Sequence, residues 1–272
     1  MRLVLNKSSI VFNKVDMMAI LSNQYNNFNR SAFEEFMATI GGESGSIWNK
    51  IQLLYMPIFS SGYEAEPLYF DVKSCTTKKP SLDASACWER TNDAIMPKVY
   101  GYKGVTLSDL YRIGVDVSGM GLTTKNACLF GALNGNPYPS SSLKWISIST
   151  DSNQIAFSIQ QRINDYVIFN QRNSTEYLTV AKGTSGFGQV SSVVMSQENG
   201  EIGVCGTFGK SHSENTIEET EVKLFEMASK DYSQLNTYGA LITIQGIAKS
   251  LTYAEADTLR IAIDNLVNKM AL

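Results

Sequence analysis

Few residues in this sequence could perform nucleophilic or acid–base chemistry. The single histidine, His212, lies in a polar stretch, so a serine–histidine or cysteine–histidine pair would have to use it. Glu219 and Glu221 would project to one side of a strand, where paired carboxyl groups could serve a glycosidase. The Glu-x-Asp-x-x-Glu pattern of jelly-roll hydrolases is absent, and the nearby Glu214 and Glu218 favour a solvated acidic edge. The sequence therefore predicts no catalytic residues and a protein that is not an enzyme.

Motifs for phosphate and metal binding are incomplete. Gly209–Lys210–Ser211 resembles the end of a P-loop, but Val204 occupies the position where that loop requires glycine. The glycine-rich stretch 183–188 lacks the strand and helix that would flank a dinucleotide site. Asp and Asn residues do not show the spacing of a calcium loop. We therefore expect no cofactor and no metal.

The composition limits the class of partner. The chain has 272 residues, a net charge of −3, and 18% charged against 43% hydrophobic residues. It has no basic surplus to neutralise a phosphate backbone, so nucleic acid is not an expected partner. The chain also lacks an apolar run near the roughly 20 residues of a membrane helix, and its amino terminus does not resemble a secretory signal. We expect no membrane association, and reduced thiols.

The four cysteines do not form a CxxC pair. They are Cys75, Cys87, Cys128 and Cys205, and their spacing is typical of structural thiols. Cys75 and Cys87 lie in one loop-like segment, and the sequence leaves open whether they pair.

Two aromatic residues are the functional feature that the sequence favours. Trp88 lies in a loop-rich stretch, and Tyr138 is held between Pro137 and Pro139. Rigid rings on loops at the rim of a β-sandwich stack on sugars or on partner surfaces. Trp88 and Tyr138 are therefore candidate contacts for a carbohydrate or a receptor, with packing in the core or at the rim as the alternative.

Most of the chain after Pro57 consists of short β-rich runs separated by turn residues. Asn199–Gly200 between two apolar runs is the strongest hairpin signal. The series without intervening helices predicts a mainly β protein with two antiparallel sheets packed face to face. The predicted strands are Pro67–Val72, Pro97–Val105, Arg112–Val117, Ala127–Ala132, Leu143–Ser149, Gln154–Gln161, Tyr166–Asn170, Tyr177–Ala181, Val190–Ser196, Glu201–Thr207, Glu219–Met227 and Tyr238–Gly246.

Helices are predicted near the two ends of the chain. A capping box of Ser31 with Glu34 predicts a helix over 31–41, and a second short helix is expected over 46–55. Thr252 and Glu255 form another capping box, which predicts a terminal helix over 252–270. Residues 1–16 are expected to form an extended arm.

A glycine-rich hinge over residues 41–46 divides the predicted organisation. Residues 1–45 form an arm and an anchoring helix, and residues 46–272 form the sandwich with its terminal helix. The apolar stripe of the anchoring helix is the expected assembly surface, which would pack on a neighbouring subunit. The alternative is that helix and arm pack back on their own sandwich. The stripe consists of Phe33, Phe36, Met37 and Ile40.

Three passages resemble a known family. They are residues 2–12, residues 47–59 running into Tyr69–Val72, and residues 246–259, with Ala248, Leu251, Thr252 and Glu255 in the last. Together they resemble virion appendage proteins of tailed phages of gut Bacteroidetes, including crAss-like phages. Those proteins are tail or head fibres of receptor-binding type.

The resemblance implies a fold, a role and a location. The fold is a jelly-roll, concanavalin-A/laminin-G-like sandwich behind a short anchor. The role is structural or adhesive, in a homotrimer on the virion, with other virion proteins and a host-surface glycan as partners. It transfers no catalytic or metal-binding residues. The alternative is a soluble carbohydrate-binding or carbohydrate-cleaving β-sandwich domain.

Overall fold

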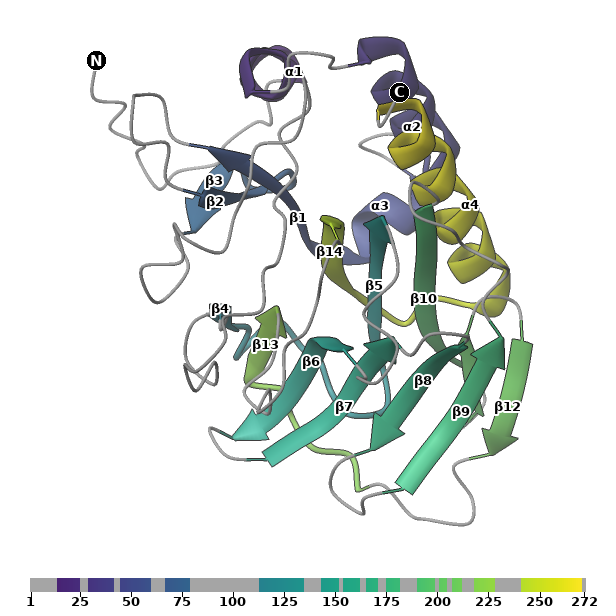
Figure 1. Ribbon diagram of the computed structural model, residues 1–272. Coiled ribbons are helices and arrows are strands. Elements are labelled where there is room, and N and C mark those ends of the chain that lie inside the picture. The colour runs from purple at the N-terminus through teal and green to yellow at the C-terminus, as the bar shows by residue number, and fades with distance from the viewer. Residues whose placement is uncertain are drawn as a thin grey trace, which may run out of the picture.

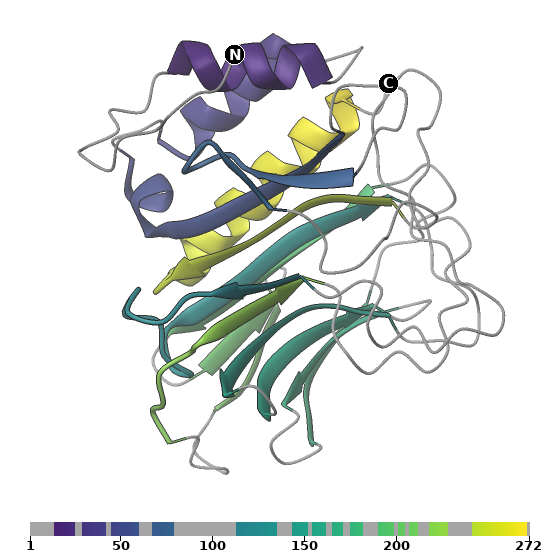
Figure 2. The same ribbon diagram turned by 90° about the vertical axis from the view of Figure 1, so that its left-hand side faces the viewer.

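Two antiparallel sheets and a helical layer make up the computed structural model (Figure 1). The larger sheet has eight strands and the smaller has six. Figure 2 shows the helices over one face of the larger sheet and the smaller sheet beyond its other face. The structure describes residues 14–24, 29–41, 45–59, 67–78, 113–134, 143–151, 154–161, 165–170, 175–181, 190–198, 201–204, 207–211, 218–227 and 241–270.

The strand order of each sheet follows hairpins and longer crossovers. The eight-stranded sheet runs β12 (Thr207–Ser211), β11 (Glu201–Val204), β10 (Val190–Glu198), β5 (Ala127–Asn134), β14 (Leu241–Lys249), β1 (Ile51–Phe59), β2 (Pro67–Asp71) and β3 (Thr76–Lys78). The six-stranded sheet runs β4 (Ile113–Asp116), β13 (Leu224–Met227), β6 (Leu143–Asp151), β7 (Gln154–Gln161), β8 (Asp165–Asn170) and β9 (Thr175–Ala181).

The predicted β-sandwich is confirmed, and most predicted strands coincide with observed ones. Glu198 pairs with Glu201 on either side of Asn199–Gly200, as the predicted hairpin requires. The predicted strand Pro97–Val105 lies outside the described residues. The short strands β3 and β12 were not predicted, because three to five residues give too little alternation to detect.

The helix predicted over 46–55 is wrong beyond its first turn. Helix α3 (Ser46–Lys50) ends at Lys50, and β1 continues directly from Ile51 through Pro57. Proline cannot donate a backbone hydrogen bond, so a strand tolerates it where one side is unpaired. This is the case at Pro57, because β14 pairs with β1 only as far as Tyr55 and Pro57 is paired with Tyr69 of β2 alone. Tertiary pairing on both sides of β1 therefore overrides its helical periodicity.

The core between the sheets is built from the apolar face of the smaller sheet. Ile146 pairs with Ile159 and Ile148 with Phe157, and all four side chains are fully buried. Cross-strand partners share one face of a sheet, so these residues form a continuous apolar surface. The second core, between the larger sheet and the helices, uses the opposite face of that sheet, including Phe130, Val194 and Ile244.

The predicted assembly stripe lies inside this second core. Helix α2 (Arg30–Thr39) packs beside α4 (Tyr253–Met270), and both cover the larger sheet (Figures 1 and 2). The stripe residues are 0–5% exposed, so they do not present a surface to another subunit. The alternative, in which the helix packs on its own sandwich, describes the structure. The corrected residues are Phe33, Phe36, Met37 and Ile40.

The amino-terminal region also differs locally from the prediction. Helix α1 (Lys14–Gln24) includes the last residues of the predicted extended arm, and residues 1–13 lie outside the described part. Asn29 caps α2 by accepting a hydrogen bond from the Ala32 amide at 2.9 Å, and Glu34 pairs with Arg30 at 3.1 Å. The predicted capping box of Ser31 with Glu34 is therefore replaced by an asparagine cap two residues earlier.

The predicted glycine hinge is a close backbone contact. Gly41 has a φ of +95°, and a Cβ added to Gly45 would lie 2.2 Å from the Gly41 Cα. Only glycine allows the chain to approach itself this closely. The core also continues across the predicted boundary at residue 45, because α2, α3 and α4 contribute to one cluster of buried side chains.

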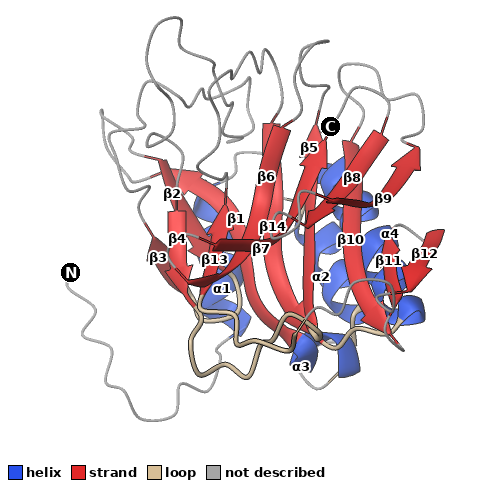
Figure 3. Ribbon diagram, turned by 90° about the horizontal axis from the view of Figure 1, so that it is seen from below, coloured by secondary structure: helices blue, strands red, loops and turns tan. Residues whose placement is uncertain are grey.

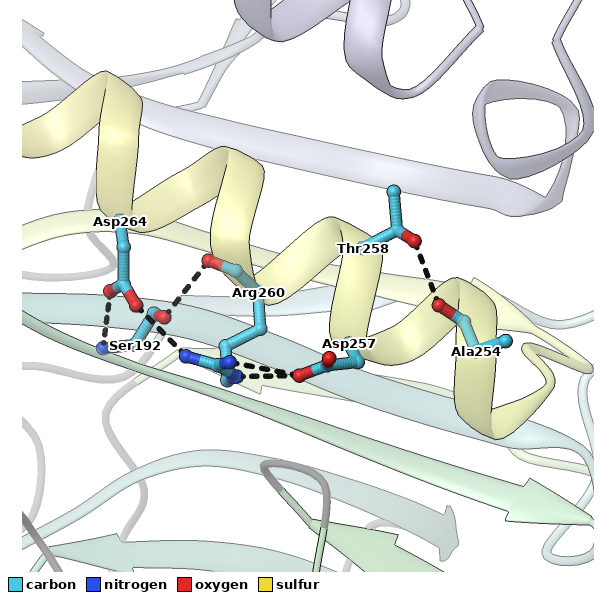
Figure 4. A network of polar contacts seen from close by, with 6 residues as sticks. All are labelled: Ser192, Ala254, Asp257, Thr258, Arg260 and Asp264. Atoms are coloured by element: carbon cyan, nitrogen blue, oxygen red, sulfur yellow. Dashed lines mark hydrogen bonds and ion pairs between the residues drawn. The ribbon is translucent and has the colours of Figure 1, made fainter.

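Polar contacts close the first turn of α4 and fix the helix to the larger sheet. The predicted capping box is confirmed: the Thr252 amide donates to Glu255 at 2.8 Å, and the Glu255 amide donates to the Thr252 hydroxyl at 3.2 Å. Further along α4, the Asp264 carboxylate accepts the Ser192 amide of β10 at 3.1 Å (Figure 4). Arg260 bridges Asp257 and Asp264 beside this contact.

A buried carboxylate closes the other end of the larger sheet. Asp71, 1% exposed, accepts the amides of Leu54 and Lys73 at 3.1 Å each and the hydroxyl of Ser74. Lys73 donates its ammonium to the Trp48 carbonyl at 3.0 Å and lies 5.5 Å from the centre of the Trp48 ring. These contacts join the β2–β3 turn to the junction of α3 and β1.

Candidate functional site

Most of the predicted site residues lie outside the described residues. These are the two aromatic candidates, Trp88 and Tyr138, and the single histidine, His212. Gly209–Lys210–Ser211 lies within β12, an edge strand, which is not the strand-to-helix turn of a P-loop. Cys87 also lies outside the described part, so the structure does not test whether it pairs with Cys75.

Within the described ranges, His, Cys, Asp and Glu do not gather into a group of three that could hold a metal ion. None of the described helices is long and apolar enough to cross a membrane.

Cys128 is completely buried, and burial raises the pKa of its thiol to about 11. This thiol is consequently a structural group rather than a nucleophile.

Glu219 and Glu221 belong to an exposed surface at one end of the sandwich. Two segments form it: residues 117–126, between β4 and β5, and residues 218–223, before β13. We call this surface the loop ledge. The described loops, tan in Figure 3, gather along one end of the strands.

Backbone hydrogen bonds hold the two segments of the loop ledge together. The Val222 amide donates to the Leu122 carbonyl at 2.9 Å, and the Val117 amide donates to the Lys223 carbonyl at 2.9 Å. Val117, Leu122 and Val222 are completely buried beneath these bonds. The ledge is thus anchored by apolar side chains and by the buried Thr124, whose hydroxyl donates to the Glu218 carbonyl at 2.8 Å, while its carboxylates remain at the surface.

The two carboxylates each contact the facing segment. Glu221 accepts the Gly119 amide at 2.9 Å, and Glu219 accepts the Thr123 hydroxyl at 3.1 Å. Asp116 similarly accepts the Ser118 amide at 2.9 Å. Hydrogen bonds from the Ser118 side chain and backbone lower the pKa of Asp116, so it is ionised at neutral pH.

Two glycines allow the tight path of this loop. Gly119 and Gly121 have φ values of +77° and +69°, a region that favours glycine. A Cβ added to Gly121 would lie 2.7 Å from the Lys249 ammonium nitrogen, so the absence of a side chain leaves room for this cation. Between the glycines, Met120 is 37% exposed, a large value for an apolar side chain.

The loop ledge combines the groups that proteins use to hold polar ligands. Carboxylates and hydroxyls accept and donate hydrogen bonds, and Met120 offers an apolar contact. Sequence reasoning identified Glu219 and Glu221 but missed their partner loop. The available signal was Ser118–Gly119–Met120–Gly121, where two glycines flank an apolar residue between predicted strands.

Comparison with known proteins identifies the fold. No family model matches the sequence, and no curated protein matches it. Solved structures do match. Trypanosoma rangeli sialidase in complex with sialic acid matches with a TM-score of 0.54 and 11% identity, over 94% of this chain and 40% of that chain. The complex of the same sialidase with the inhibitor DANA gives 0.51 and 11%, over 92% and 39%.

These matches show a shared fold, and the chain spans less than half the length of the sialidases. The prediction that the protein is not an enzyme is contradicted, because the matched structures named here are those of a sialidase. The prediction gave too much weight to the single histidine. Glycosidases rely on carboxyl groups, whose availability a count of histidines does not limit.

Proposed function

We propose that this protein is a carbohydrate-recognising β-sandwich that binds a glycan at the loop ledge. If the protein is a glycosidase, cleavage of the glycan takes place at the same surface. The observation that supports the proposal is the match in fold to a sialidase in complex with sialic acid, which extends over 94% of this chain. The ledge supplies exposed carboxylates, hydroxyls and an apolar side chain on a rigid scaffold. Loops held by a rigid sandwich are common positions for binding sites.

Each group of the ledge has a role in such binding. Glu219 and Glu221 accept hydrogen bonds from sugar hydroxyl groups with their carboxylate oxygens. Thr123 forms an isolated antiparallel bridge with Glu221, and its hydroxyl group is already oriented by Glu219. Met120 packs against the apolar face of a sugar ring.

The carboxylates of Glu219 and Glu221 favour an uncharged sugar over an anionic one at their position. The amides of Ser118 and Gly119, which could bind an anion, already donate to Asp116 and Glu221. An added carboxylate would therefore displace an existing one and would meet the charge of Glu219. We expect neutral glycans to bind more tightly than their sialylated forms.

The test is a glycan array with matched neutral and sialylated glycans, followed by calorimetric titration of the strongest ligand. We expect Glu219→Gln and Glu221→Gln to weaken binding about tenfold or more, which corresponds to about 1.4 kcal/mol. Glu34→Gln on helix α2 is the matched control, because this exposed glutamate lies on the helical layer. Absence of binding to every glycan would refute the proposal.

Cleavage is measured in the same experiment by the release of sugar over time. A ledge variant that still binds the glycan but no longer releases sugar would give that glutamate a catalytic role. If the wild-type protein binds the glycan but releases no sugar, its function is lectin-like binding without cleavage.

We further propose, from the sequence resemblance of residues 2–12, 47–59 and 246–259, that the protein is a trimeric component of a phage virion. The glycan would then lie on the host surface, and the chain would contact other virion proteins. Because the α2 stripe is buried, such contacts must use other surfaces. Mass spectrometry of purified particles and light scattering of the isolated protein test location and trimerisation, and absence from particles would refute the location.

A further inference from the structure

Strands β6 and β7 of the six-stranded sheet carry apolar side chains on one face and buried hydroxyl groups on the other. Ser147 and Ser149 alternate along β6 with Ile146 and Ile148, and Ser158 on β7 alternates with Phe157 and Ile159. Because successive residues of a strand point to opposite faces, the serines lie on the face of β6 and β7 opposite to these apolar side chains. We call Ser147, Ser149 and Ser158 the serine row.

The serine row is as inaccessible as the apolar core. Ser147 and Ser158 are 0% exposed and Ser149 is 2% exposed. Ser147 and Ser158 are direct partners across β6 and β7. Facing Cβ atoms in such a pair lie about 4.5–5.5 Å apart, so a single small molecule can contact both hydroxyl groups.

The hydroxyl of Ser158 is the unusual group. Its oxygen is buried and has no hydrogen-bond partner among the residues that the structure describes. A buried hydroxyl without a partner loses its hydration without compensation, so native proteins seldom keep one. Such groups are commonly satisfied by a buried water that makes two to four hydrogen bonds.

We propose that Ser158 and Ser147 bind a buried water molecule that bridges β6 and β7. The site is polar, and two hydroxyl groups from facing positions supply donors and acceptors. Beside the site, the Ser149 carbonyl accepts the Lys223 amide of the loop ledge at 2.9 Å. The bridging water therefore stabilises the strand to which the ledge is attached, and this proposal does not depend on the ligand of the ledge.

The test is a high-resolution crystal structure of the whole chain combined with thermal unfolding of Ser158→Ala, Ser147→Ala and the double variant. We expect a water about 2.7–3.2 Å from both serine oxygens. Each single variant should lower the melting temperature by about 2–4 °C. The double variant should lower it by less than the sum of the two single variants, because the first substitution already removes the bridge.

Two results would overturn the proposal. One is a site without a water between the two oxygens. The other is an unchanged or higher melting temperature for Ser158→Ala, which is the result for a hydroxyl that had no partner at all. Ser46→Ala, at an exposed position of helix α3, is the control for loss of a serine hydroxyl and should leave the melting temperature nearly unchanged.

Discussion

The helical layer covers one face of the larger sheet, the loop ledge lies at one end of the strands, and the two differ in the side chains that they bury. The helical layer buries large apolar side chains such as Phe33 and Phe36 against the larger sheet. The ledge buries smaller side chains, Val117, Leu122, Val222 and the polar Thr124, and leaves its carboxylates exposed. The contrast indicates that the helices contribute stability, whereas the ledge is free to contact a ligand.

The largest expected effect tests the helical side of this comparison. Phe33→Ala should reduce the free energy of unfolding by about 3–5 kcal/mol, because it removes a completely buried aromatic ring. Denaturant unfolding measures the change. Ile261→Ala on α4 is the control, since Ile261 is 43% exposed and should cost little. A loss below about 1 kcal/mol for Phe33→Ala would mean that α2 is dispensable to the fold.

The next effect concerns the polar corner at Asp71. Asp71→Ala should destabilise the protein by about 1–3 kcal/mol, because the amides of Leu54 and Lys73 lose their acceptor. Asp71→Asn keeps an acceptor oxygen and should cost less. Equal losses for the two variants would show that the charge, rather than the hydrogen bonds, holds this corner.

A smaller effect is expected at the start of α4. Thr252→Ala should cost about 0.5–2 kcal/mol through loss of the capping box with Glu255. Thr258→Ala is the control within the same helix, because the Thr258 hydroxyl donates only to the Ala254 carbonyl (Figure 4). Thermal unfolding that ranks the control as the more damaging substitution would contradict the assigned cap.

The smallest effect is a pH dependence at Asp264. Burial raises the pKa of Asp264 against the opposing contacts of Ser192 and Arg260. The folded protein therefore binds this proton more tightly than the unfolded chain does. Relative to Asp264→Asn, the wild type should gain stability as the pH falls through the raised pKa, up to a plateau below about 3.9. Denaturant unfolding at several pH values checks this, and a gain toward alkaline pH would contradict it.

The sequence predicted most of the strands and the terminal helix because their signals are local. Alternating apolar residues mark β6 and β7, and Thr252 with Glu255 marks the start of α4. The segment after Lys50 was mispredicted because its apolar spacing also fits a helix. The segment forms a strand because it pairs with β2 on one side and with β14, about 190 residues later in the sequence, on the other.

The position of the apolar helix and the shape of the site could not be predicted for the same reason. The stripe around Phe36 is apolar whether it faces its own sheet or another subunit, and only the tertiary structure distinguishes the two. Glu219 and Glu221 were visible in the sequence, but their partners Thr123 and Gly119 lie about a hundred residues earlier. A single sequence does not show such long-range contacts.

A paired measurement on Glu221→Gln tests the central claim most directly. Calorimetric titration gives its affinity for the glycan that the array selects, and denaturant unfolding gives its stability. We predict an affinity at least about tenfold weaker than that of the wild type, with the free energy of unfolding changed by less than about 0.5 kcal/mol. An unchanged affinity for a glycan that the wild-type protein binds would contradict the assignment of carbohydrate recognition to the loop ledge.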